Sequence, residues 1–261
     1  MPNSLQGFGI AVTRPVDQAR RLNAAIEQQG GKAISFPLIA IAPLSDYSEF
    51  EQTLDSLEHA DWAIFISTNA VDNAMPRVIT RYNTLPENLK FAAIGHQTAK
   101  ELSLYGVHNV LIPHTRFDSE TLLALGEMQS VANANILIFR GVGGREVLAD
   151  TLKARGAHVS FAESYRRVNP QSNCTTIESL WRNGQCHAIV VTSSEAMRHL
   201  LQMTNNGTDD WIRNIKICVN HARIAEEAEA AGLCAFVAEA PGDDAMLACL
   251  QQALSPATSQ S

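Results

Sequence analysis

The chain has 261 residues, enough for one large domain or for two smaller ones that each have a core of their own. Hydrophobic residues make up 46% of it and charged residues 18%, a composition that excludes wholesale disorder. The formal net charge of -7 disfavours general binding to nucleic acids or to anionic membranes, so any anion must be held by local donors.

The first residues of the chain, its histidines and its cysteines exclude several kinds of protein. Residues 1–7 lack the basic and apolar segments of a signal peptide, and no apolar run could span a bilayer, so we expect a cytoplasmic protein without a membrane partner. The eight histidines include no H-x-x-x-H pattern and no C-x-x-C pair occurs, so we expect no metal site. Buried, reduced thiols are expected at Cys174, Cys186, Cys218, Cys234 and Cys249.

Short apolar runs along the chain predict buried strands, each followed by a turn and an amphipathic helix. In chain order these runs are residues 10–12, 63–66, 91–94, 136–139, 188–191 and 217–219. The helices after the first and fourth runs are expected to end at Gly30 and Gly156, which suit left-handed C-terminal caps. Strands that alternate with helices predict parallel sheets covered on both faces, as in doubly wound α/β folds.

The two halves of the chain repeat each other at an offset of 126 residues, the separation of Ile10 from Ile136. The same offset aligns Ser67 with Ser193, and it marks the same local features throughout. A repeat of this length predicts two similar α/β lobes. From the residues alone, we expect the chain to divide near residue 130.

Two stretches interrupt the alternation of strands and helices. Residues 37–44 are apolar and bounded by prolines, and their counterpart in the repeat is the segment 163–170. Both are expected to be extended connections rather than core strands of a lobe. The serine-rich tail 255–261 is expected to be disordered.

Polar residues gather at the carboxyl ends of the predicted strands, where doubly wound sheets bind their ligands. The helices that start there present free N–H groups and a dipole that favour anions. If the two lobes face each other, these turns would form one cleft suited to a ligand with several carboxylates. The repeat-related residues expected at the two mouths are Arg14 and Arg140, Ser67 and Ser193, and Gly95 and His221.

Hydroxyl clusters follow two of the predicted strands, at residues 67–69 and 192–194. Their side chains can cap the next helix by accepting backbone N–H bonds. Because a cap leaves neighbouring amides free for a ligand, capping and ligand binding are compatible at these positions.

Residues 140–146 form the turn with the most ligand-binding features. Its three glycines let the backbone approach a ligand closely, and Arg140 and Arg145 can each hold a carboxylate. A flexible turn with solvated arginines is the alternative. The segment is neither a Walker loop nor a full G-x-G-x-x-G motif, so nucleotide binding is not supported.

Tyr165 lies in the second expected connection, beside Arg166 and Arg167. A phenol has a pKa of about 10, so it stays protonated and can donate a hydrogen bond to a leaving oxygen. The alternative is a tyrosine that packs on the connection.

Six segments, taken together in this order and spacing, resemble the uroporphyrinogen-III synthases: 12–15, 65–71, 93–99, 140–146, 165–166 and 191–196. The resemblance spans residues 8–250 and implies two flavodoxin-like lobes joined by a two-stranded extended linker. It places one lobe at 1–36 with 170–261, the other at 44–161, and the linker strands at 37–43 and 162–169. The first strand and helix would then pack with the C-terminal lobe.

The resemblance also implies an activity. A lyase of this family closes hydroxymethylbilane, a linear tetrapyrrole with many carboxylates, to uroporphyrinogen III in the cleft between the lobes, with loss of water and inversion of ring D. It needs no metal or organic cofactor, because the substrate's pyrroles are electron-rich and the protein mainly folds the substrate and shields the cation. The resemblance further implies a monomer, and a transient contact with the upstream deaminase is one expectation about its partners.

By resemblance, Tyr165 is the expected catalytic residue and assists departure of hydroxide. The expected substrate-binding residues are Arg14, Ser67, Thr68, Asn69, Gly95, Thr98, Arg140, Gly141, Gly144, Arg145, Thr192, Ser193, Ser194 and His221. Two positions depart from the family's pattern. Ile66 replaces a usual threonine, so one hydroxyl is lost, and His221 stands where the family often has a small residue.

Two other classes compete with this hypothesis. A non-catalytic two-lobed binding protein for a small polyanionic ligand would use the same turns. A two-lobed glycosyltransferase is disfavoured, because no motif for a sugar-nucleotide diphosphate is visible.

Overall fold

The computed structural model describes residues 4–114 and 116–255, so the tail expected to be disordered lies, except for Ser255, outside the described residues. Contacts along the chain divide it into two units, Met1–Ala40 with Val168–Ser261 (unit 1) and Ile41–Arg167 (unit 2). Among the described residues, the helices include none with the length and apolar composition that crossing a bilayer requires.

Unit 1 is built on a five-stranded parallel sheet with the order β11-β10-β9-β1-β2. Its strands are β1 (Gly9–Val12), β2 (Lys32–Ser35), β9 (Ala188–Val191), β10 (Lys216–Val219) and β11 (Ala235–Val237). The central strands β1 and β9 are buried throughout, as expected for apolar strands covered on both faces.

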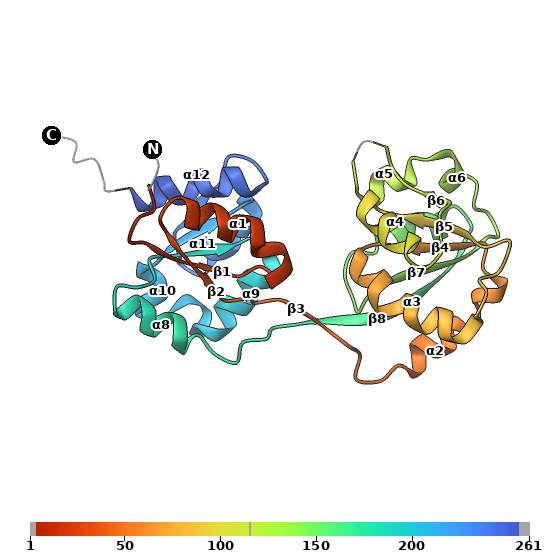
Figure 1. Cartoon of the computed structure of the whole chain (residues 1–261), viewed down its shortest axis with the longest axis horizontal. Coiled ribbons are helices and arrows are strands. Elements are labelled where there is room, and N and C mark those ends of the chain that lie inside the picture. The colour runs from red at the N-terminus through yellow and green to blue at the C-terminus, as the bar shows by residue number, and fades with distance from the viewer. Residues whose placement is uncertain (1–3, 115, 256–261) are drawn as a thin grey trace. The chain divides into compact units, whose positions relative to one another are not determined.

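Helices cover both faces of this sheet (Figure 1). One face holds α1 (Val16–Gln28) and α12 (Asp243–Leu254), which pack on Ile10 and Val12 of β1. On the other face Ala11 of β1 packs with the remaining helices, because successive side chains of a strand point to opposite faces. These are α8 (Thr175–Arg182), α9 (Ser194–Met203), α10 (Asp210–Asn214) and α11 (Ala222–Ala230), with a short 3-10 helix η2 (Asn205–Gly207).

Unit 2 is built on a six-stranded sheet with the order β3-β8-β7-β4-β5-β6, in which the strands from β8 to β6 run parallel. Its strands are β3 (Ala40–Ala42), β4 (Trp62–Phe65), β5 (Lys90–Ala93), β6 (Val110–Leu111), β7 (Asn135–Gly141) and β8 (His158–Val168). Phe65 of β4 and Phe139 of β7 stack with ring centroids 4.3 Å apart on one face of this sheet.

Two helical layers cover the sheet of unit 2 as well. The face that carries Phe65 is covered by α2 (Ser48–Leu54), the 3-10 helix η1 (Leu57–His59), α3 (Thr68–Tyr82) and α4 (His96–Ser103). The opposite face is covered by α5 (Ser119–Leu123), α6 (Gly126–Gln129) and α7 (Val147–Ala154). The six predicted strands and the doubly wound α/β architecture are therefore confirmed.

The internal repeat is visible in the sheet topology. The order β11-β10-β9-β1-β2 of unit 1 corresponds, strand for strand, to the order β6-β5-β4-β7-β8 of unit 2. Gly30 and Gly156, with φ of +79° and +87°, follow the equivalent helices α1 and α7 as left-handed residues. The division near residue 130 was wrong, because β1 pairs with β9 and β7 pairs with β4. Each sheet therefore combines strands from both halves of the chain: β1 and β2 join β9 to β11, and β7 and β8 join β4 to β6.

The segment 163–170 differs from the expectation of an extended connection outside the core. Strand β8 continues through it to Val168 and pairs with β7, with Glu163 opposite Arg140 and Tyr165 opposite Gly141. Tyr165 is fully buried in the core of unit 2. The expectation that Glu163–Tyr165 lie outside the core strands was therefore wrong, because the large side chain of Tyr165 gains a hydrophobic site beneath α3.

Candidate functional site

The turn from β4 to α3 carries the first hydroxyl cluster. Ser67 is the N-cap of α3, and its Oγ accepts a hydrogen bond from the Ala70 N–H at 3.2 Å. Thr68 and Asn69 occupy the first turn of α3, where backbone N–H groups have no partner within the helix. All three residues are half-buried, so this turn combines a satisfied cap with amides that a ligand could use.

Tyr165 lies directly behind this turn. Its Oη is 3.2 Å from Ser67 Oγ, and the residue is fully buried. The ring packs on Gly141, where a Cβ would lie only 2.6 Å from Tyr165 Cε2. The Val142 N–H also donates to the Tyr165 carbonyl at 2.8 Å. Gly141 is therefore required by the packing of Tyr165, beyond any contact that its backbone makes with a ligand.

Arg140 points into the protein and holds its own loop. Its side chain is buried; Nε donates to the Gly141 carbonyl at 3.2 Å, and Nη2 donates to the Gly143 carbonyl. The guanidinium also lies 4.5 Å from the centroid of the Phe161 ring. Glu163 completes the arrangement by accepting from the Gly143 N–H at 3.0 Å. A buried guanidinium engaged in this way stabilises the turn 141–144.

Arg145, five residues further on, behaves differently from Arg140. Its side chain is 71% exposed and forms an ion pair with Glu120, with Nη2 2.6 Å from Oε1. Gly143 and Gly144, between the two arginines, have φ of +68° and +109°, which suits glycine at both positions. Of the two arginines predicted as ligands, Arg140 is thus buried and stabilises the loop, whereas Arg145 is an exposed cation.

The turn from β5 to α4 offers small residues. Gly95 is the N-cap of α4 and has no side chain to cap it, while Thr98 in the first turn is buried. A Cβ at position 95 would lie 3.3 Å from Phe117 Cβ, so the space beside Gly95 is limited. The amide-rich end of α4 is consequently reached past Phe117 and His96, whose rings lie 5.1 Å apart.

In unit 1 the turn after β1 centres on Arg14. Its Nη1 is 2.5 Å from Asp243 Oδ1, and its Nε donates to Thr192 Oγ1 at 3.3 Å. Both charged side chains are 14% exposed. Two of the predicted ligand residues, Arg14 and Thr192, are therefore in contact. Asp243 was missed from the sequence, because nothing in the pattern around it shows that α12 brings it to Arg14.

The turns after β9 and β10 contain unpaired polar atoms. Ser193 caps α9 by accepting from the Ala196 N–H at 3.1 Å. Within the described ranges, Ser194 Oγ and Asn220 Oδ1 are buried and have no hydrogen-bond partner. Buried polar atoms are normally paired, so these two mark places where a ligand or solvent could bind. His221 is exposed at the N-cap position of α11, and its side chain makes no cap.

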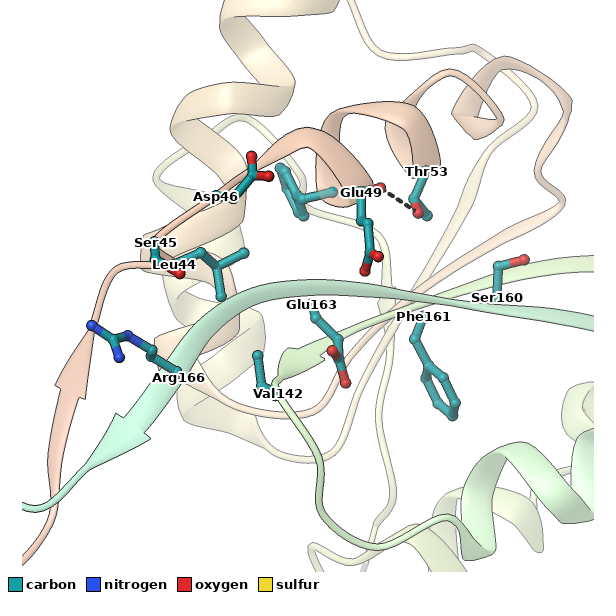
Figure 2. Close-up of a pocket in the computed structure, with 11 residues that line it drawn as sticks. Leu44, Ser45, Asp46, Glu49, Thr53, Val142, Ser160, Phe161, Glu163 and Arg166 are labelled. Carbon is teal, nitrogen blue, oxygen red and sulfur yellow. Dashed lines mark hydrogen bonds between the residues drawn. The ribbon is translucent and has the colours of Figure 1, made fainter.

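A cavity of about 790 Å³ in unit 2 lies along β8 and the start of α2 (Figure 2). Figure 2 shows the carboxylates of Asp46, Glu49 and Glu163 among its lining, with Arg166 at one end. Three carboxylates beside one cation would repel a polyanion. The cavity borders the turn 140–146 through Val142, but none of the predicted ligand residues lines it.

The side chains that commonly bind metals do not cluster in the part of the chain that the structure describes. Within residues 4–114 and 116–255, no group of three or more His, Cys, Asp or Glu side chains is arranged to hold a metal ion. The polar groups at the strand ends are instead hydroxyls, backbone amides and arginines, which are donors suited to oxyanions.

These features define a class of protein: a chain of two α/β units with the same strand order, each with helix N-termini and hydroxyl caps at the carboxyl ends of its central strands. A sequence model of the family described as uroporphyrinogen-III synthase HemD matches residues 20–248. The chain belongs to this family.

Individual relatives agree with the family match. The chain is 32% identical over 246 residues to the uroporphyrinogen-III synthase of Escherichia coli K12, covering 94% of this chain and 100% of that protein. It is 33% identical over 194 residues to the Proteus mirabilis enzyme of the same name, covering 74% and 98%.

Two solved structures share the fold. A mutant uroporphyrinogen III synthase from the extremely thermophilic bacterium Thermus thermophilus matches with a TM-score of 0.61 at 17% identity, covering 95% of this chain and 98% of that one. The Helicobacter pylori 26695 enzyme matches with a TM-score of 0.54 at 16% identity, covering 95% and 99%.

Proposed function

We propose that this chain is an enzyme that converts hydroxymethylbilane to uroporphyrinogen III, as a cyclising lyase that works without a cofactor. The observation that carries the proposal is the family match across residues 20–248. Overall, the hydroxyl and one proton of the substrate leave as water, and ring D is inverted as the macrocycle closes. The electron-rich pyrroles drive loss of the hydroxyl, so the protein's task is to fold the substrate and to exclude water.

The substrate's carboxylates are bound by the donors at the strand ends of each unit. The N-termini of α3 and α4 in unit 2, and of α9 and α11 in unit 1, supply free amides and a favourable dipole. The unpaired atoms Ser194 Oγ and Asn220 Oδ1 support a ligand at the unit 1 turns. The proposed substrate-binding residues at these four helices are Ser67, Thr68, Asn69, Gly95, Thr98, Thr192, Ser193, Ser194 and His221.

The arginines of these turns have different proposed roles in substrate binding. Arg145, being largely exposed, is proposed to bind a carboxylate by leaving Glu120. Arg14 is proposed to bind one with the part of its guanidinium that Asp243 and Thr192 leave free. The loop that contains Gly141 and Gly144 presents backbone amides, and buried Arg140 holds that loop in shape.

Tyr165 is proposed to assist loss of the substrate's hydroxyl. Its hydrogen bond to Ser67 at the N-terminus of α3 supports this role, since the phenol is tied to a turn that faces the ligand side of the sheet. The expected lobe and linker bounds, the monomeric state and the transient contact with the upstream deaminase stay predictions.

The product isomer tests the proposed function. Without enzyme, hydroxymethylbilane closes to the type I isomer, so purified protein should yield the type III macrocycle on chromatography. Protein that binds the substrate and releases only the type I isomer would instead be the non-catalytic binding protein.

A further inference from the structure

Ser67 and Tyr165 form a hydrogen-bonded pair whose members differ in accessibility. Their oxygens are 3.2 Å apart, and Tyr165 is 0% exposed, whereas Ser67 is half-buried. A fully buried phenol does not touch a substrate in this structure. Any effect of Tyr165 on the reaction must therefore pass through a neighbour, and Ser67 is the neighbour to which its hydroxyl is bonded.

The direction of this hydrogen bond follows from counting protons and lone pairs. A serine hydroxyl has one proton and two lone pairs, and the Ala70 N–H already donates to Ser67 Oγ at 3.2 Å. Among the described residues, Ser67 is the hydrogen-bond partner of the Tyr165 hydroxyl. Because a buried phenol proton needs an acceptor, Tyr165 donates to the second lone pair of Ser67.

With both lone pairs engaged, the proton of Ser67 remains as the free donor of the pair. It belongs to a half-buried residue at the carboxyl end of β4, on the side of the sheet where ligands bind. We propose that the Ser67 O–H donates a hydrogen bond to the substrate oxygen that leaves as water, and that Tyr165 is a positioning residue which acts through Ser67. This inference rests on the proposed function.

The surroundings of Tyr165 hold the pair in place. Gly141 leaves no room for the ring to move toward β7, since even a Cβ there would lie 2.6 Å from Cε2. The other half of the repeat shows the cap without this arrangement. Ser193 caps α9 in the same way as Ser67 caps α3, but the offset of 126 places Ile39 where Tyr165 would be. The donor pair is thus particular to unit 2.

A double-mutant cycle tests the coupling. Ser67→Gly removes the hydroxyl yet keeps most of the stability of a helix cap, and Tyr165→Phe removes the phenol. We expect Ser67→Gly to lower kcat about tenfold or more while KM changes less than about twofold, because the donor acts as the C–O bond breaks. Tyr165→Phe should also lower kcat, and the double variant should be no slower than Ser67→Gly alone.

Two matched variants separate the donor from the cap. Ser67→Thr keeps a hydroxyl and should retain most of kcat. Ser193→Gly removes the equivalent cap alone, so it should lower the melting temperature less than Ser67→Gly, which also leaves the buried Tyr165 phenol without its acceptor. Effects that multiply in the double variant would show that the phenol acts independently of Ser67 and would overturn the inference. A raised KM with unchanged kcat for Ser67→Gly would overturn it as well, since Ser67 would then bind a carboxylate.

The hydrogen-bond direction can be measured without turnover. NMR of tyrosine-labelled protein should show a slowly exchanging Tyr165 hydroxyl proton close to Ser67, and Ser67→Gly should abolish the slow exchange. A slowly exchanging Ser67 proton directed at Tyr165 Oη would reverse the assignment and overturn it. Wild-type protein that makes only the type I isomer would overturn the proposed function and the contact with the leaving oxygen, whereas this measurement would still decide the direction of the bond.

Discussion

Gly141 at the end of β7 and Tyr165 of β8 lie opposite each other on neighbouring strands, and Tyr165 belongs to the core of unit 2. The contact between them therefore connects the turn after β7 to that core. No side chain fits at position 141 while the ring of Tyr165 keeps its place, because the added Cβ would overlap the ring. The glycine thus sets where the phenol lies, and through the phenol it affects Ser67.

We predict that Gly141→Ala displaces the ring of Tyr165. Overpacking of this kind lowers the free energy of unfolding by about 1–3 kcal/mol, and kcat should fall with it. Gly126→Ala is the matched control, since a Cβ at Gly126 meets nothing within 4 Å; it should change stability by less than about 0.5 kcal/mol. Urea unfolding and initial rates measure both effects. A fully active, equally stable Gly141→Ala variant would contradict the packing argument.

Mutation of the two arginines of the turn 140–146 should affect the stability of the protein to different extents. Arg140→Ala leaves two carbonyls and Glu163 without their buried partner, so the free energy of unfolding should fall by about 2 kcal/mol or more. Arg145→Ala removes an exposed ion pair and should change stability by less than about 1 kcal/mol.

The same pair of variants distinguishes a residue that binds substrate from one that stabilises the fold. If Arg145 binds a substrate carboxylate, Arg145→Ala raises KM by about threefold to tenfold. Denaturant curves and steady-state rates on both variants give the comparison. Unchanged KM in Arg145→Ala would remove it from the proposed binding residues.

At the scale of elements, all five thiols of the protein lie in or beside the helices and strands of unit 1. All five cysteines lie between residues 174 and 249, and only Cys234 is exposed among them. Burial raises the pKa of the Cys174 thiol to about 12 and that of Cys186 to about 11. Thiol labelling of the four buried cysteines therefore reports the unfolding of unit 1.

We predict that unit 1 loses stability at alkaline pH. Unfolded thiols release their protons near pH 9, whereas Cys174 and Cys186 stay protonated in the folded state to about pH 12 and 11. The folded state then binds more protons, so the free energy of unfolding falls as pH rises through this window. Labelling rates of the buried thiols at pH 8, 9 and 10 test the trend. Because other groups also titrate here, a Cys174→Ala, Cys186→Ala variant is the control and should show a flatter dependence.

At the scale of the whole molecule, the two units differ in how the chain builds them. Unit 2 is one continuous segment, whereas the sheet of unit 1 needs β1 and β2 from the start of the chain beside β9 from its second half. Each unit has hydrophobic clusters on both faces of its own sheet. Unit 2 therefore contains everything that a domain needs to fold alone.

We predict that the fragment 41–167 folds independently and unfolds cooperatively. Trp62, which is 7% exposed and is the single tryptophan of this segment, reports the transition by fluorescence in urea. The fragment 41–157 lacks β8 and with it Ala162 and Tyr165 of the core, so it should not fold. A gradual, non-cooperative change in the longer fragment would show that unit 2 depends on unit 1.

The sequence by itself determined the central strands, the helices that follow them, the repeat and the capping serines. These features depend on apolar runs and on turns a few residues long, and such patterns are local. It also carried the family resemblance, because the six motifs keep their order along the chain.

Only the tertiary structure decided which strands pair and where the polar side chains point. The edge strands β2, β6 and β11 were not predicted, because they are short and partly exposed and so lack a continuous apolar run. Arg140 and Arg145 look alike in the sequence, yet the side chain of Arg140 is buried beside Glu163 and that of Arg145 is exposed. The partners of Arg14 and Tyr165, Asp243 and Ser67, lie far away along the chain. Local patterns do not specify such contacts, since they form only when distant strands assemble into one sheet.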